Sequence, residues 1–196
     1  MISPIYTLSP DVPPPNIKEI RRYADCKDGA DVPLGEVLEE TNNLTYKVAC
    51  RELDIKITGE EIDFGFTKII SSDLAKNLKN SEKVIIFAAT VGILPDKMIK
   101  KYSVVSPVKA LFWQAVGTER VEALCDEFST IIADEYQKKG YKALPRFSPG
   151  YGDLPLEMQT DIMSLLECNK TLGITLNDSL LMTPSKSVTA IIGLSK

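Results

Sequence analysis

The longest helical pattern in this sequence of 196 residues runs from about Ser106 to Lys139, and it limits the folds open to the chain. The pair Ser106-Pro107 is typical of a helix start, and Lys138, Lys139 and Gly140 are typical of a helix end. Between these points apolar residues recur at steps of three and four, which is the period of a helix. The sequence therefore predicts one long central helix.

Two apolar rows can be followed along this predicted helix. The first row consists of Val121, Leu124, Cys125, Phe128, Ile131 and Ile132. The second begins with Val108, Leu111 and Ala115 and leads, at helical steps, through Thr118 to Glu122. A carboxylate at the edge of an apolar row could pair with an ammonium or sulfonium group, but Glu122 could equally be a solvated helix residue, as most charged residues are. Phe112 and Trp113 are expected to be core or interface residues.

Strand patterns occupy the middle of the chain. Alternation of apolar and polar residues predicts a strand from Cys50 to Thr58 that Phe64 to Ile70 extends or pairs with, and the apolar run from Val84 to Ala89 suits an interior strand. A short helix is expected between them, beginning near Ser72. Strands mixed with long helices favour an α+β fold, with a mainly antiparallel sheet flanked by helices.

The two ends of the sequence differ in character. Five prolines keep residues 1–15 extended, and Asn16 is expected to cap a helix that ends near Ala24. Further helices are predicted for the ranges 33–47 and 155–168, and hairpin strands for 173–193. We expect residues 1–196 to form a single domain, because this length is usual for one core.

Charge and residue usage disfavour several classes of function and exclude one. A net charge of −4 offers no cationic field for nucleic acid, and no segment approaches the about 20 apolar residues that span a bilayer. The amino end has no signal-peptide pattern, so a cytoplasmic protein is expected. The four cysteines are far apart and are expected to be reduced thiols. The chain has no histidine, which excludes a Ser-His-Asp hydrolase and disfavours a zinc site.

Residues 146–152, with the sequence RFSPGYG, are the main candidate for a binding site. Arg146 supplies a planar fork that can hold a carboxylate with two hydrogen bonds, the glycines let a ligand lie against main chain, and Pro149 stiffens the loop. Tyr151 adds a flat apolar face with a polar tip. These parts suit a small zwitterion that bears a carboxylate and an aromatic ring. The alternative is an ordinary proline and glycine turn with a surface arginine.

The order and spacing of motifs resemble one known family. The pattern R-x-x-P-G-Y from Arg146 is followed by Leu165-Leu166 and then by G-I-x-L-x-x-S-x-x-M-x-P-x-x-S-V from Gly173 to Val188. Upstream, A-V-G-T-x-x-V-E-A from Ala115 matches as well. Over residues 84–193 the sequence resembles the activation domain of cobalamin-dependent methionine synthase, in a stand-alone form.

The resemblance implies roles for particular residues. In that family the domain binds S-adenosylmethionine in a shallow groove, and the arginine matching Arg146 holds the methionine carboxylate. The positions of Ser148, Gly150 and Tyr151 would contact the adenosyl portion, and Glu122 would lie near the amino or sulfonium end. The resemblance assigns no catalytic residue and no metal ligand to this chain.

The resemblance also implies a function and partners. The family's domain supports reductive methylation of cob(II)alamin, in which S-adenosylmethionine gives the methyl group and a flavodoxin-like donor gives the electron. Cobalamin and the histidine that ligates its cobalt would belong to a separate methionine synthase chain. Two other hypotheses stay open: an activator of another corrinoid methyltransferase, and a non-catalytic module that binds a corrinoid protein.

Overall fold

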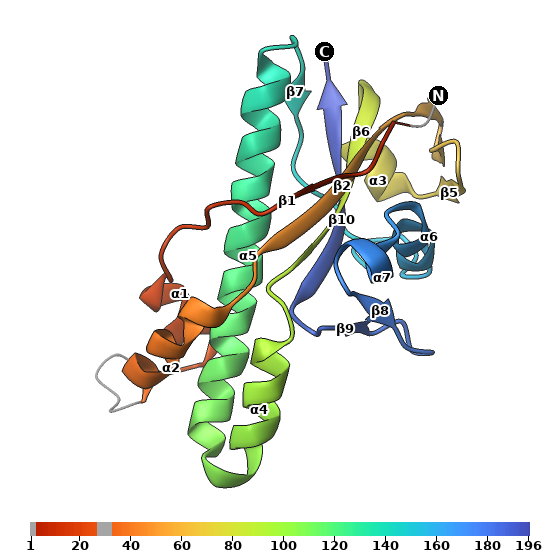
Figure 1. Cartoon of the computed structure of the whole chain (residues 1–196). Coiled ribbons are helices and arrows are strands. Elements are labelled where there is room, and N and C mark those ends of the chain that lie inside the picture. The colour runs from red at the N-terminus through yellow and green to blue at the C-terminus, as the bar shows by residue number, and fades with distance from the viewer. Residues whose placement is uncertain (1–2, 27–32) are drawn as a thin grey trace.

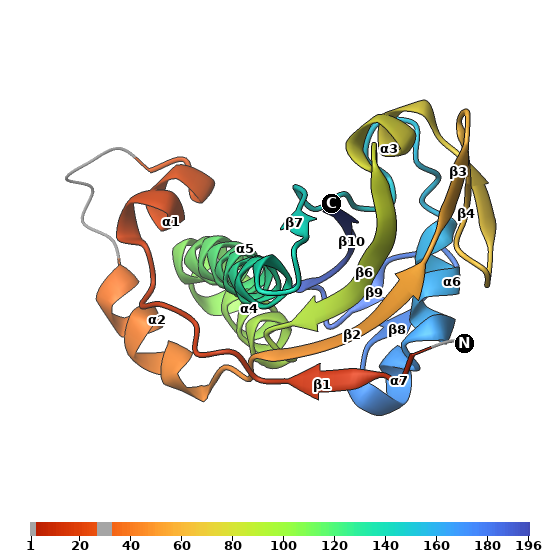
Figure 2. The same cartoon turned by 90° about the horizontal axis from the view of Figure 1, so that it is seen from above.

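A five-stranded antiparallel sheet forms the centre of the computed structural model, which describes residues 3–26 and 33–196 (Figures 1 and 2). Its strands, in spatial order, are β1 (Tyr6–Leu8), β2 (Lys47–Asp54), β6 (Ser81–Thr90), β10 (Ser187–Ser195) and β7 (Lys142–Ala143). All four pairings are antiparallel. The predicted α+β fold with a mainly antiparallel sheet is confirmed.

Strand β6 lies between β2 and β10 and is buried on both faces. Its side chains alternate: Ile85 and Phe87 belong to a core on one face of the sheet, whereas Val84 and Ile86 belong to a second core on the other. This two-sided burial explains why Val84 to Ala89 is a continuous apolar run.

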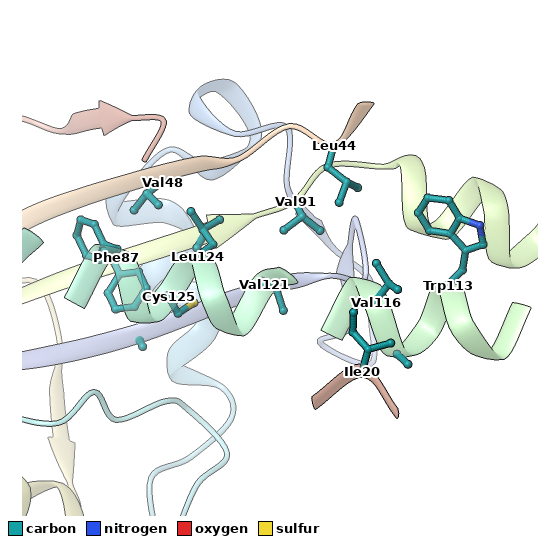
Figure 3. Packing of buried hydrophobic residues seen from close by; sticks show 14 of the residues in the cluster. Ile20, Leu44, Val48, Phe87, Val91, Trp113, Val116, Val121, Leu124 and Cys125 are labelled. Atoms are coloured by element: carbon teal, nitrogen blue, oxygen red, sulfur yellow. The ribbon is translucent and has the colours of Figure 1, made fainter. Parts of the chain in front are cut away.

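The long helix α5 (Pro107–Gln137) packs on the concave face of the sheet (Figure 2). The predicted central helix is therefore confirmed. Three shorter helices accompany it, namely α1 (Ile17–Tyr23), α2 (Leu34–Glu40) and α4 (Leu94–Val105), and α2 continues into a 3-10 turn, η1 (Thr41–Asn43). Figure 3 shows Trp113, Val116, Val121 and Leu124 of α5 in this core, and Phe112 and Trp113 are fully buried, as expected.

The opposite face of the sheet carries smaller elements. They are the helices α3 (Ser72–Asn77), α6 (Met158–Leu165) and α7 (Cys168–Thr171) and a three-stranded sheet of β3 (Lys56–Thr58), β4 (Glu61–Asp63) and β5 (Lys68–Ile70). Strands β8 (Thr175–Leu176) and β9 (Met182–Thr183) pair with each other beside them. The loop that joins β7 to α6 contains residues 146–152.

The structure corrects several sequence-based boundaries. The predicted strand from Cys50 to Thr58 divides into β2 and β3, which belong to different sheets. The predicted helix over 33–47 ends at η1, because Lys47 already belongs to β2. The helix predicted over 155–168 is shorter than expected, because α6 covers Met158–Leu165 and α7 begins only at Cys168. The hairpin prediction fits β8 and β9, but it is wrong for β10, which pairs with β6 and β7.

The second apolar row of α5 is only partly buried. Ala115 is buried, but Val108 and Leu111 are 47 % and 44 % exposed. Helix α4, which packs against α5, was not predicted from the sequence. The first row lies in the core almost throughout.

The extended amino-terminal segment lies along the sheet and α5. It contributes β1, and Asn16 caps α1 by accepting hydrogen bonds from the backbone N–H groups of Lys18 and Glu19, as predicted. Residues 1–2 of the segment predicted to be extended lie outside the described residues. All four cysteines are free thiols. Among the helices in the described part of the chain, none is both long enough and apolar enough to pass through a bilayer.

Candidate functional site

The loop from Arg146 to Leu154 is closed by its own hydrogen bonds. Phe147 exchanges two backbone hydrogen bonds of 2.9 Å with Ile191 of β10, which fixes the start of the loop to the sheet. Gly150, at φ +84°, donates its N–H to Leu154 O at 3.0 Å, and Tyr151 donates to Ser148 O at 3.1 Å. A ligand on this loop would therefore have to use main-chain atoms other than the N–H groups of Gly150 and Tyr151.

Asp153 fastens the far end of the loop to helix α3. Its carboxylate accepts hydrogen bonds from the Ser71 hydroxyl and from the backbone N–H groups of Ser72, at 2.8 Å, and Asp73, at 3.2 Å. The hydroxyl and these N–H groups hold the pKa of Asp153 below its usual value. A carboxylate at a helix start is the charge that the helix dipole favours. Asp153 was not predicted from the sequence, because its partners lie about 80 residues earlier in the chain.

Gly152 is the position at which this loop least tolerates a side chain. Its φ is +55°, and a Cβ there would lie 2.6 Å from Asp73 Oδ2, so the Asp73 side chain would have to move. Gly152→Ala is expected to cost about 1–3 kcal/mol of unfolding free energy, partly from the left-handed backbone and partly from this contact. Gly140→Ala is the matched control, because Gly140 has φ +80° and open space around it. Urea unfolding of both variants checks the prediction, and equal losses would show that the Asp73 contact costs nothing.

Arg146 and Glu122 meet in the structure. The Arg146 guanidinium donates to Glu122 Oε2 and to Asp126 Oδ1, both at 2.5 Å. The two carboxylates lie one turn apart on α5, at the spacing that places side chains on one helix face. The Arg146 side chain is 25 % exposed and that of Glu122 is 42 % exposed, so the pair lies at the surface. Asp126 was missed, although its spacing of four residues from Glu122 was a usable signal.

The electrostatics of this cluster suit a zwitterion. Burial opposes the charge of Arg146, but the Asp126 and Glu122 carboxylates outweigh it and raise the pKa of the guanidinium. Two carboxylates against one guanidinium leave a negative charge that can attract a cation. Only two of the five guanidinium N–H donors are used by these two bonds, so others can bind a carboxylate. Next to the cluster, burial raises the pKa of the Cys125 thiol to about 12, and that thiol is therefore neutral.

Tyr151 and Ser148 complete the set of predicted site residues. The Tyr151 side chain is 69 % exposed and its ring meets Phe147 edge to face, with ring centres 5.3 Å apart. The rest of the Tyr151 ring is thus open to a flat ligand. Ser148 is half-buried in the loop between them. The structure brings Arg146 and Glu122 into contact and places Ser148, Gly150 and Tyr151 on the same loop as Arg146.

A cleft of about 500 Å³ adjoins Glu122 on the side of α5 that faces α1. Its lining includes the ion pair of Arg120 with Glu119 and four further carboxylates, those of Glu19, Glu122, Asp126 and Glu127. Arg146 and Tyr151 do not line it. Glu122 and Asp126 therefore lie between the Arg146 loop and this cleft.

The Lys186 side chain contacts α5 one helical turn before Glu122. Its Nζ donates to Thr118 Oγ1 at 2.9 Å, and its aliphatic stem passes so close to Gly117 that a Cβ there would lie 2.9 Å from Lys186 Cγ. Burial lowers the pKa of Lys186. Lys186 was not predicted, since nothing local shows that the turn before β10 lies on α5. With Lys186 at one end and Arg146 at the other, this face of α5 carries a cation on both sides of Glu122.

The chain was compared with known families and structures. The family described as "Vitamin B12 dependent methionine synthase, activation domain" matches residues 67–195. Thirteen chains of solved structures match. One of them, described as "Crystal Structure of the MetH Reactivation Domain bound to AdoHcy", has a TM-score of 0.64 and 16 % identity, over 98 % of this chain and 79 % of that one. The search of curated proteins gave no match.

The structural match, at this low identity, supports the fold. The family match extends over more than half of the chain and includes the loop, the helix glutamate and β10. The resemblance drawn from the sequence motifs is thereby confirmed. The chain belongs to the family of activation domains of vitamin B12-dependent methionine synthase.

Proposed function

We propose that residues 1–196 act as a single activation domain that binds S-adenosylmethionine on the Arg146 loop. The methyl group would be presented to cobalamin held by a separate methionine synthase chain, in the reductive methylation of cob(II)alamin. The observation that carries the proposal is the contact of Arg146 with Glu122 and Asp126 next to the exposed Tyr151 ring. A related fold with AdoHcy bound supports it, because AdoHcy is what remains of S-adenosylmethionine after methyl transfer.

Each predicted site residue has a task in this proposal. The unused N–H groups of Arg146 bind the methionine carboxylate, while Glu122 attracts the ammonium or sulfonium end. Ser148, Gly150 and the ring of Tyr151 contact the adenosyl portion. These contacts orient the methyl group away from the Arg146 loop and toward solvent, where a partner can approach.

The chemistry of the reaction belongs to the partner. When bound there, cobalamin supplies the metal centre that accepts an electron and the methyl group. The present chain has no histidine, so an imidazole ligand to cobalt must come from residues outside this sequence. A flavodoxin-like protein is the proposed electron donor.

A reactivation assay tests the proposal. The partner chain loaded with cob(II)alamin is mixed with reductant, S-adenosylmethionine and this chain, and formation of methylcobalamin is followed by absorbance. We expect methylation to require both this chain and S-adenosylmethionine. An unchanged rate when this chain is omitted would disprove an activation function.

One observation favours a second candidate, a non-catalytic module that binds a corrinoid protein. Arg146 is already paired with two carboxylates, and the Gly150 and Tyr151 N–H groups are used inside the loop. If this candidate is right, the chain binds the partner, but the rate of cobalamin methylation is the same with and without the chain. Replacing the partner by another corrinoid methyltransferase in the same assay tests the remaining alternative, an activator of such an enzyme.

A further inference from the structure

Four apolar side chains are exposed where α4 turns into α5. They are Val104, Val105, Val108 and Leu111, which are 85 %, 72 %, 47 % and 44 % exposed, and we call them the hairpin tip. Figure 1 shows that α4 and the start of α5 extend beyond the sheet. Single exposed apolar residues need no explanation, but a cluster of them often marks an interaction surface.

The hairpin tip is bordered by positive charge. Lys97, Lys100 and Lys101 are exposed on α4, and the last two lie one helical turn before Val104 and Val105. Residues 97–111 contain four lysines and no acidic residue, whereas the whole chain has a net charge of −4, so the remaining residues carry −8. One of the four, Lys109, is paired with Glu36, which leaves Lys97, Lys100 and Lys101 as the border of the tip. A partner that fits this surface has an apolar hollow rimmed by carboxylates.

The hairpin tip shares a helix face with the ligand site. Val108 and Leu111 begin the row that leads through Thr118 to Glu122, so all four project to one side of α5. The 14 residues from Val108 to Glu122 correspond to about 21 Å of helix. A stable interface covers about 800 Å² on each partner, a patch about 30 Å across, so one partner over the Glu122 site can reach the tip.

We infer that the hairpin tip is a docking surface for the cobalamin-bearing partner chain, through an acidic region with an apolar centre. The inference rests on the proposed function, which brings that partner to the Arg146–Glu122 face. A second copy of this chain fits less well, because two-fold pairing of tips would place lysines against lysines. A membrane also fits less well, because the tip has none of the aromatic residues that anchor interfacial helices.

Binding of the full-length chain to the cobalamin-loaded partner tests the inference. The double variant Val104→Ser/Val105→Ser is expected to raise the Kd about tenfold, as loss of an interface anchor does. Lys97→Glu/Lys100→Glu is expected to slow association and to reduce its salt dependence. Ile70→Ser is the matched control, since Ile70 is 70 % exposed on β5, at the other side of the molecule (Figure 1). It is expected to leave the Kd unchanged.

Each outcome has one meaning. An unchanged Kd in both double variants overturns the inference. The inference is also overturned if the same variants leave partner binding unaffected but abolish a dimer that is seen in sedimentation velocity. The same holds if they abolish only binding to phosphatidylcholine vesicles that contain phosphatidylglycerol. Titration of S-adenosylmethionine into each variant separates this result from the proposed function. If a variant binds S-adenosylmethionine normally and its Kd for the partner is unchanged, only the docking surface is rejected. If the unmodified chain does not bind S-adenosylmethionine, the proposed function is rejected instead.

Discussion

Alanine in place of Arg146 is expected to weaken S-adenosylmethionine binding by about 30- to 150-fold, which corresponds to about 2–3 kcal/mol. The substitution removes the proposed partner of the ligand carboxylate. It also leaves Glu122 and Asp126 without their guanidinium, and these carboxylates would then repel the ligand carboxylate. Isothermal titration calorimetry of the unmodified chain and of the variant measures the change.

Two further variants show which property of Arg146 matters. Arg146→Lys keeps the positive charge but not the planar fork, so it should retain part of the affinity. Lys170→Ala is the matched control, because it removes an exposed cation of α7 that pairs with exposed Glu167, and it should leave the affinity unchanged. Equal affinity of the unmodified chain and Arg146→Ala would remove Arg146 from the site.

The sequence predicted those parts of the candidate site that depend on local pattern. Arg146 and Tyr151 belong to one short motif, and Glu122 follows from the period of one helix. Asp153 and Lys186 could not be found in the same way, because their tasks depend on contacts with α3 and α5, which are distant in sequence. Asp126 is an intermediate case. Its position on the helix face of Glu122 could be predicted from the sequence, but its contact with Arg146 could be seen only in the folded structure.

The same division applies to the fold. Val84 to Ala89 and the long helix carry strong periodic signals, and both were predicted. The pairing of β10 with β6 joins residues about 100 positions apart, which no local pattern reports. Helix α4 was missed, although Leu94, Met98 and Tyr102 follow one another at helical steps and pack into the core, so a usable signal was present. Its last turn carries the exposed valines Val104 and Val105. A helix end at the surface is expected to carry polar residues, and the proposed docking surface accounts for the exposure of these two valines.

A second large effect is expected at a buried ion pair that holds the amino-terminal segment on α5. Arg120 and Glu119 have side chains only 2 % and 6 % exposed, and the Arg120 fork donates to both Glu119 oxygens at 2.5 and 2.6 Å. Arg120 also donates to Pro13 O at 2.5 Å and Pro14 O at 3.3 Å, and Glu119 accepts from the Asn16 N–H at 3.1 Å. Prolines 13 and 14 have no N–H to offer a sheet, but their carbonyl oxygens are held by this guanidinium.

Arg120→Met is expected to lower the free energy of unfolding by about 3–5 kcal/mol, because it leaves the Glu119 carboxylate buried without its cation. Denaturant unfolding measures the loss. Lys170→Met is the matched control: its partner Glu167 is exposed like Lys170 itself, and such pairs contribute about 0–1 kcal/mol. Glu119→Leu/Arg120→Met removes both charges and should recover part of the stability, although the Pro13 and Pro14 carbonyls still lose their donor.

The double variant separates two explanations of the loss. If the buried charge is the cause, the double variant is more stable than Arg120→Met alone. If the lost hydrogen bonds to the amino-terminal segment are the cause, the two variants are equally unstable, and α1 becomes a site of early proteolysis in both. A loss below about 1 kcal/mol in Arg120→Met would contradict both explanations, and would mean that this pair resembles an exposed ion pair in spite of its burial.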